Sequence, residues 1–161
     1  PTPTLKGREM MFDAQVAYGK GPKLREGKDI AVITIGAIGN TMAEAIEMAE
    51  SGKWKVDSQE ANNRYQIAHY DLRWLKPLDE EMLHEIGKQY STIVTAEDGI
   101  LAGGMGSAVL EWMSDHNYHP HIIRLGVNDQ FVEHGSTKEL YHLLNLDKEG
   151  LCESLLQALE K

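Results

Sequence analysis

Apolar residues along the chain gather in short runs separated by helical patterns. Residues 30–36 form a continuous β-branched run ended by glycine, which is typical of a strand buried on both faces of a parallel sheet. Three more segments, 67–73, 92–96 and 121–126, predict further strands. The strand signal therefore recurs four times along the sequence.

Helical spacing fills the stretches between these strands. The apolar stripes that predict buried helix faces are Met42, Ala45, Ile46 and Ala49 in the first helix, and Met82, Leu83 and Ile86 in the second. A glycine-rich segment, 103–107, leads into a third helix that ends near His116, and a leucine-rich helix closes the chain. The side chains placed to cap helices are Asn40 or Thr41, Asp79, Ser136 and Asp147.

Strands that alternate with helices predict the fold class. We expect an α/β protein, a three-layer α/β/α sandwich with a mostly parallel sheet of about five strands and right-handed crossovers. Residues 1–28 are largely polar and favour an interdomain lead-in, with the domain at 29–161. Residues 51–66 have no clear pattern and predict an exposed connection or an added hairpin.

Composition narrows the class of protein. The 161 residues are 42% hydrophobic, enough for one domain with a real core. The net charge of −9 argues against nucleic acid and anionic membranes as partners. The single cysteine, Cys152, lies in an apolar run, so we expect no internal disulfide and a reducing compartment. We find neither a membrane-spanning run nor a signal-peptide pattern, and we expect a soluble, cytoplasmic protein.

The glycine-rich segment 103–107 has two interpretations. Backbone N–H groups at a helix start can bind a phosphate or another small anion, which would suit a free-standing binding module. The segment lacks the G-x-G-x-x-G pattern and a P-loop lysine, so close helix packing or an interface is favoured. The segment 36–39 is interpreted as a simple strand-to-helix turn.

Glu97 and Asp98 follow a predicted strand at the sheet edge where ligands gather in open α/β folds. Neighbouring residues on an extended segment point in opposite directions, which argues against an acid–base pair. We therefore expect Glu97 to anchor a nearby turn through hydrogen bonds.

Other polar residues give weaker signals. His116, His119 and His121 lie close in sequence, yet without a cysteine or carboxylate cluster they favour a polar loop over a metal site. His134 is either a contact residue or a solvated loop residue. Ser107 and Ser136 fit helix starts, and no base or orienting group marks a nucleophile. The sequence thus predicts no catalytic, cofactor-binding or metal-ligating residue.

Several motifs resemble the C-terminal, transketolase-like domain of 1-deoxy-D-xylulose-5-phosphate synthases. They are Tyr70-Asp-Leu-Arg-Trp-Leu-Lys-Pro-Leu-Asp79, the stretch from Glu97 to Ser107, the stretch from Ile123 to Ser136, and the Tyr18-Gly-Lys-Gly21 lead-in. The resemblance runs from about Tyr18 to the end. The long connection 51–66, and Asn128 where proline is common, depart from the family pattern.

This resemblance implies a larger thiamine-diphosphate-dependent transferase that joins pyruvate to glyceraldehyde 3-phosphate with loss of carbon dioxide, for isoprenoid and thiamine synthesis. Upstream domains would hold thiamine diphosphate and magnesium, and this chain alone would be inactive. It would pack against those domains in a homodimer. The residues with an implied structural or interface role are Arg73, Lys76, Asp79, Glu97, Gly103, Gly104, Gly106, Ser107 and His134. Transketolase or a 2-oxo acid dehydrogenase β subunit stays open as the parent.

Overall fold

One five-stranded sheet organises the chain. The computed structural model describes residues 17–52 and 65–160. The strands are β1 (Lys23–Arg25), β2 (Ile30–Thr34), β3 (Ile67–Asp71), β4 (Thr92–Ile100) and β5 (His121–Val127), in the order β1-β3-β2-β4-β5. β3, β2, β4 and β5 run parallel, and β1 pairs antiparallel with β3. The mostly parallel sheet of about five strands is therefore confirmed.

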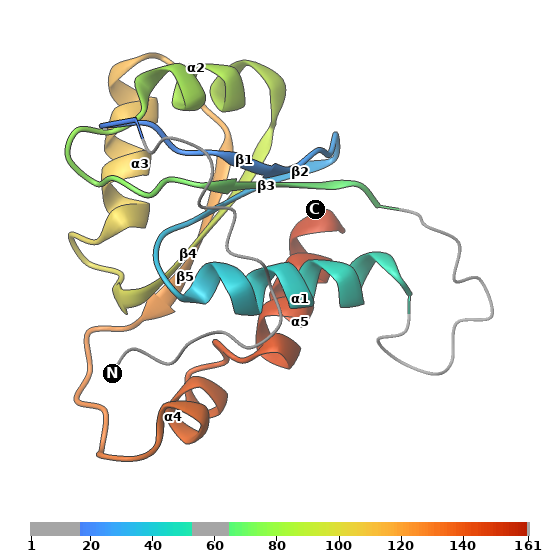
Figure 1. Ribbon diagram of the computed structural model, residues 1–161, viewed down its shortest axis with the longest axis vertical. Helices are drawn as coiled ribbons and strands as arrows, with labels where there is room; N and C mark the ends of the chain where they lie inside the picture. Colours follow the sequence, from blue (N-terminus) through green and yellow to red (C-terminus); the bar gives the residue numbers. More distant parts are fainter. Residues whose placement is uncertain (1–16, 53–64, 161) are drawn as a thin grey trace.

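Helices cover both faces of the sheet (Figure 1). Helices α1 (Ile38–Glu50) and α5 (Lys148–Leu159) form one outer layer, and α2 (Glu80–Gln89) and α3 (Met105–Asp115) form the other. Each face has its own core because side chains alternate along β2: Val32 packs under α1 and α5, whereas Ile33 packs under α2 and α3. This arrangement confirms the three-layer sandwich.

Three predicted helix caps are confirmed and one is wrong. The side chains of Asp79, Ser136 and Asp147 each accept a hydrogen bond from the backbone three residues on. The first helix instead begins at Ile38, so neither Asn40 nor Thr41 caps it. Gly36 has a φ of +80°, which turns the chain directly after β2 and starts the helix earlier than the polar residues suggest.

Two strands differ from the sequence pattern. Strand β4 continues past Ala96 to Ile100, with a shift in its register against β5. Strand β1 lies inside the segment 1–28; its residues are mostly exposed and carry no apolar alternation. The domain boundary at residue 29 stays a prediction, and residues 53–64 of the unpatterned connection lie outside the described residues.

Helix α4 (Thr137–Leu143) differs from the other helices because none of its residues is buried. It follows a loop from Asn128 and lies beyond the layered body (Figure 1). Across the described ranges, none of the helices has the length and apolar character needed to cross a bilayer.

Candidate functional site

The start of helix α3 holds a carboxylate supplied by the chain itself. The Oε2 atom of Glu97 accepts a hydrogen bond from Met105 N at 2.8 Å, and its Oε1 atom accepts one from Gly106 N at 2.9 Å. Only 6% of Glu97 is exposed. Because the negative charge of Glu97 lies at the positive end of helix α3, the two hydrogen bonds stabilise the junction between β4 and α3. Glu97 thus takes the place that an external anion would need.

Two glycines allow this close approach. A Cβ on Gly104 would lie 2.3 Å from the backbone oxygen of Ile100 and 2.4 Å from Glu97 Oε2. A Cβ on Gly106 would lie 2.5 Å from Oγ1 of Thr95, a buried hydroxyl with no hydrogen-bond partner within the described part of the chain. Both helix residues must therefore lack a side chain for α3 to contact β4. This geometry supports the packing interpretation of the glycine-rich segment.

A second set of hydrogen bonds holds the loop before α3. The Ser107 hydroxyl donates to the backbone oxygen of Leu101 at 2.7 Å and accepts from Gly103 N at 3.1 Å. The Arg124 guanidinium on β5 donates to the same Leu101 oxygen at 3.0 Å and to Ser107 Oγ at 2.8 Å. Sequence reasoning missed Arg124, although a lone charge in an apolar strand was a usable signal. The loop is tied to both β5 and α3.

Asp98 points away from its neighbour, as expected for an extended segment. It is exposed, and its Oδ2 atom accepts a hydrogen bond from the Tyr141 hydroxyl of α4 at 3.2 Å. Burial, followed by the Asp98 charge, raises the pKa of Tyr141. The two adjacent carboxylates therefore serve different contacts and do not form an acid–base pair.

Asp79 joins the lead-in to helix α2. Its carboxylate accepts hydrogen bonds from Gly21 N at 3.0 Å and Met82 N at 3.2 Å, and Lys20 Nζ lies 3.2 Å away. Burial raises the pKa of this carboxyl, but the two N–H donors and the Lys20 ammonium outweigh it and hold the pKa below its ordinary value. Asp79 is thus a charged anchor between segments far apart in sequence.

The other predicted residues of this motif lie near the surface. Arg73 adopts a positive φ of 57°, and its backbone N and Nε donate to Asp71 at 2.9 and 3.2 Å. Lys76 is exposed and precedes a cis peptide bond to Pro77. Their suggested part in positioning the turn or an interface stays a prediction.

The histidines lie apart from the α3 junction. His116 stacks on Trp112 with ring centroids 3.9 Å apart, and both His119 and His134 are exposed. Over the described residues, no group of three or more histidine, cysteine or acidic side chains is arranged to hold a metal ion. A contact role for His134 stays a prediction.

One buried histidine escaped the sequence analysis. His69 Nε2 lies 2.9 Å from Thr34 Oγ1, and only 2% of His69 is exposed. Burial, with a smaller contribution from the nearby Arg25 charge, lowers the pKa of His69 to about 4. The imidazole is therefore neutral at physiological pH. Its position in an otherwise apolar strand was the available signal.

The layered fold is that of a transketolase-type C-terminal α/β domain. The chain belongs to the family described as Transketolase, C-terminal domain, which matches residues 19–151. It is 56% identical over 156 residues to the 1-deoxy-D-xylulose-5-phosphate synthase of Phocaeicola vulgatus, covering 94% of this chain and 23% of that relative. The same enzyme of Bacteroides fragilis is 56% identical over 151 residues, covering 91% of this chain and 22% of the relative.

The suspected resemblance is therefore confirmed, and the chain spans about a quarter of the length of these curated relatives. Among solved structures, it is similar to a split gene transketolase described as an inactive beta4 tetramer. The TM-score is 0.80 and the identity 28%, covering 96% of this chain and 46% of the other. A transketolase of Pichia stipitis in complex with sedoheptulose 7-phosphate has a TM-score of 0.58 at 14% identity, covering 88% of this chain and 18% of the other, and supports the fold alone.

Proposed function

We propose that this chain is the C-terminal domain of a 1-deoxy-D-xylulose-5-phosphate synthase and that it serves assembly, not chemistry. The parent enzyme would condense pyruvate with glyceraldehyde 3-phosphate to give 1-deoxy-D-xylulose 5-phosphate and carbon dioxide in the cytoplasm. High identity over nearly the whole chain supports this parent more than transketolase, of which two solved structures are 28% and 14% identical to this chain. The length of these relatives supports the assignment of this chain as one domain of a longer protein, because each relative is several times longer than this chain.

The observation that carries the assembly role is the placement of Glu97 on the α3 start. A glycine-rich helix start suits a diphosphate, but here its N–H groups bond to the buried carboxylate, whose charge would repel a second anion. The described residues therefore do not fit thiamine diphosphate with magnesium. We assign these groups to the other domains of the parent chain, and this domain to packing against them within a homodimer.

The test uses the full parent enzyme carrying Gly104→Leu, with Ala102→Leu as a matched control at an exposed site two residues away. The leucine at position 104 must push against backbone and Glu97, so we expect less folded dimer and unchanged thiamine diphosphate affinity per folded dimer. The Ala102→Leu control should keep both the amount of folded dimer and the thiamine diphosphate affinity. A selective loss of cofactor affinity in an intact dimer would contradict the assembly role.

A complementary measurement concerns the isolated chain. Titration with inorganic phosphate and with pyrophosphate should give no saturable heat, since Glu97 occupies the glycine-rich start of α3. Saturable binding that survives Glu97→Gln would instead favour the free-standing anion-binding module.

A further inference from the structure

Strand β5 ends the sheet with an open edge. Among the described strands it pairs only with β4, and its residues are partly exposed, whereas every residue of β2 is buried. Natural edge strands are usually protected by lysine, proline or bulges on the open side. β5 has neither lysine nor proline, and its one cationic side chain, Arg124, is directed to Leu101 and Ser107. A register shift against β4 is the one irregularity of this edge, and the outward backbone groups of β5 have no strand partner among the described residues.

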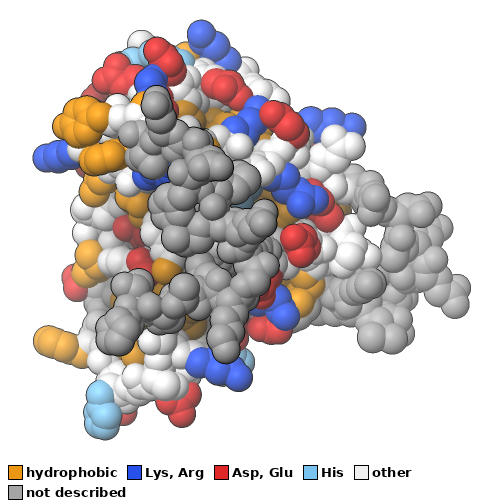
Figure 2. Space-filling model, viewed as in Figure 1, with side chains coloured by type: hydrophobic (Ala, Val, Ile, Leu, Met, Phe, Trp, Pro, Cys, Tyr) orange, Lys and Arg blue, Asp and Glu red, His pale blue; other side chains and the backbone are white. Residues whose placement is uncertain are grey.

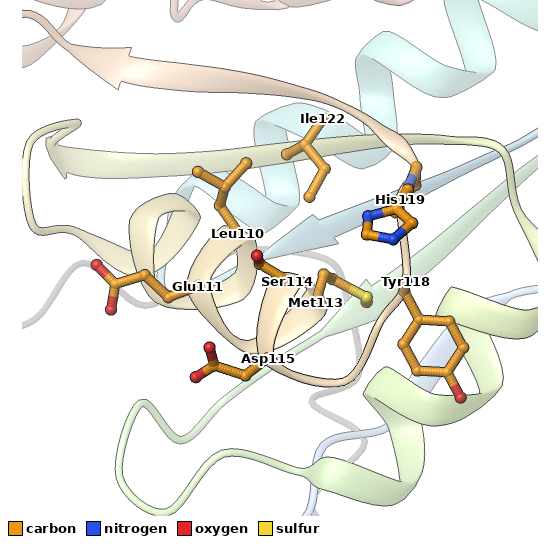
Figure 3. Close-up of a pocket in the computed structure, with 9 residues that line it drawn as sticks. Leu110, Glu111, Met113, Ser114, Asp115, Tyr118, His119 and Ile122 are labelled. Atoms are coloured by element: carbon orange, nitrogen blue, oxygen red, sulfur yellow. The ribbon is translucent and has the colours of Figure 1, made fainter.

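A shallow groove adjoins the start of this edge. It has a volume of about 600 Å³ and lies between the second half of α3 and the beginning of β5. Figure 3 shows Leu110 and Ile122 on its apolar side, with the carboxylates of Glu111 and Asp115 extending from the helix at the rim. Leu110 is 45% exposed. The groove therefore offers an apolar contact beside a negative rim.

The loop after β5 adds a third apolar feature. Phe131 is fully exposed, at 108% of its reference area, and Leu143 of the following α4 is 68% exposed. Leaving a phenylalanine in water forgoes the stabilisation that burial of its ring would give. Apolar side chains project on the side of the molecule where α3 and the loop before α4 lie (Figures 1 and 2). We name the edge, the groove and the loop together the β5 face: Leu110, His121–Val127 and Phe131.

We propose that the β5 face is the surface by which this domain docks onto the remaining part of the parent chain. This inference rests on the proposed function and deepens it. The chain spans 23% of the length of its Phocaeicola relative, so most of such a polypeptide lies outside this domain. Two copies of the domain, each with a charge of −9, would repel one another, which disfavours a second copy as the occupant. The acidic rim calls for a basic residue on the docking segment.

The test is amide hydrogen exchange on the full-length parent enzyme. Half of the β5 amides point away from β4, so they should be protected only if another part of the chain covers the edge. We expect these outward β5 amides to be protected in the wild type. In the double variant Leu110→Lys/Phe131→Ser their protection factors should fall by about tenfold. Leu24→Lys is the control, because Leu24 is 41% exposed on β1 at the opposite edge. Unchanged exchange rates of the β2 amides verify that each variant is folded.

Two outcomes would overturn the proposal. Unprotected outward amides in the wild-type parent would mean that the edge is free. Protection that disappears on dilution, together with dissociation of the oligomer by sedimentation, would assign the face to a second copy. Product formation from pyruvate and glyceraldehyde 3-phosphate is measured on the same samples, so a wrong parent assignment is distinguished from a wrong surface.

Discussion

The carboxylate of Glu97 lies 2.9 Å from the backbone nitrogen of Gly106 and reaches the neighbouring Met105 nitrogen as well. A residue inside a strand thus satisfies two N–H groups of the helix that begins eight residues later. The contact needs a glycine at each close approach, since a Cβ on Gly104 or Gly106 would meet atoms of β4. Strand, loop and helix are therefore one unit.

Glu97→Gln should destabilise the chain by about 1–3 kcal/mol, because the amide keeps one acceptor oxygen and loses the charge that strengthens both hydrogen bonds. The measurement is urea unfolding. Glu133→Gln makes the same chemical change on an exposed loop residue and should have little effect. Equal midpoints for the two variants would mean that the α3 junction contributes nothing to stability.

Alanine at the two adjacent glycines should separate crowding from backbone strain. Gly103 has a φ of +74° with open space around its missing Cβ, so Gly103→Ala should cost about 1 kcal/mol. Gly104→Ala meets a backbone oxygen at 2.3 Å and should cost more, about 3 kcal/mol. Comparison of the two unfolding free energies checks the order. A larger loss at position 103 would contradict the close packing of α3 on β4.

Hydrophobic pattern predicted much of this fold because the core strands are continuous or alternating apolar runs. β2 is recognisable in the sequence as an unbroken apolar run because all five of its residues are buried. Asp79, Ser136 and Asp147 are recognisable as helix starts because their capping hydrogen bonds are local. Strand β1 was missed because Lys23–Arg25 is polar and pairs only at the edge of β3. Its presence depends on tertiary pairing, which no local pattern encodes.

The candidate site was less accessible from sequence. The position of Glu97 after a predicted strand marks it as a candidate, but the choice between an external anion and this internal carboxylate depends on β4 continuing past Ala96. The bonds from Arg124 to Leu101 and Ser107 join residues up to 23 positions apart, and spacing gives no sign of them. The carboxyl edge of the sheet could be predicted, and the atoms that meet there could not.

His69 should make stability fall on mild acidification. Its pKa is lowered from 6.5 to about 4 in the fold, so the unfolded chain takes up a proton first as the pH falls. The contribution of the neutral His69 to the free energy of unfolding is fully present above pH 6.5 and is lost as the pH falls towards 4. Between about pH 7 and about pH 5 we expect a loss of about 2 kcal/mol in the free energy of unfolding, measured with urea.

The variant His69→Gln supplies the control for this pH dependence. It lacks the titrating ring, so its stability should change less over the same interval, whatever its absolute value. The carboxyls with lowered pKa values, such as Asp79 and Asp147, lose their contributions at lower pH and do not mimic the effect. Parallel curves for wild type and variant would exclude His69 as the source.

Asp79→Asn should loosen the lead-in from α2 and lower the free energy of unfolding by about 1–3 kcal/mol. The amide cannot accept from Gly21 and Met82 with both oxygens, and it loses the Lys20 pairing. Hydrogen exchange should show faster exchange at Gly21 N, a local readout that general destabilisation of α2 does not give. Glu80→Gln, an exposed neighbour in the first turn, is the matched control. Unchanged Gly21 exchange in the Asp79 variant would mean that another contact holds the lead-in.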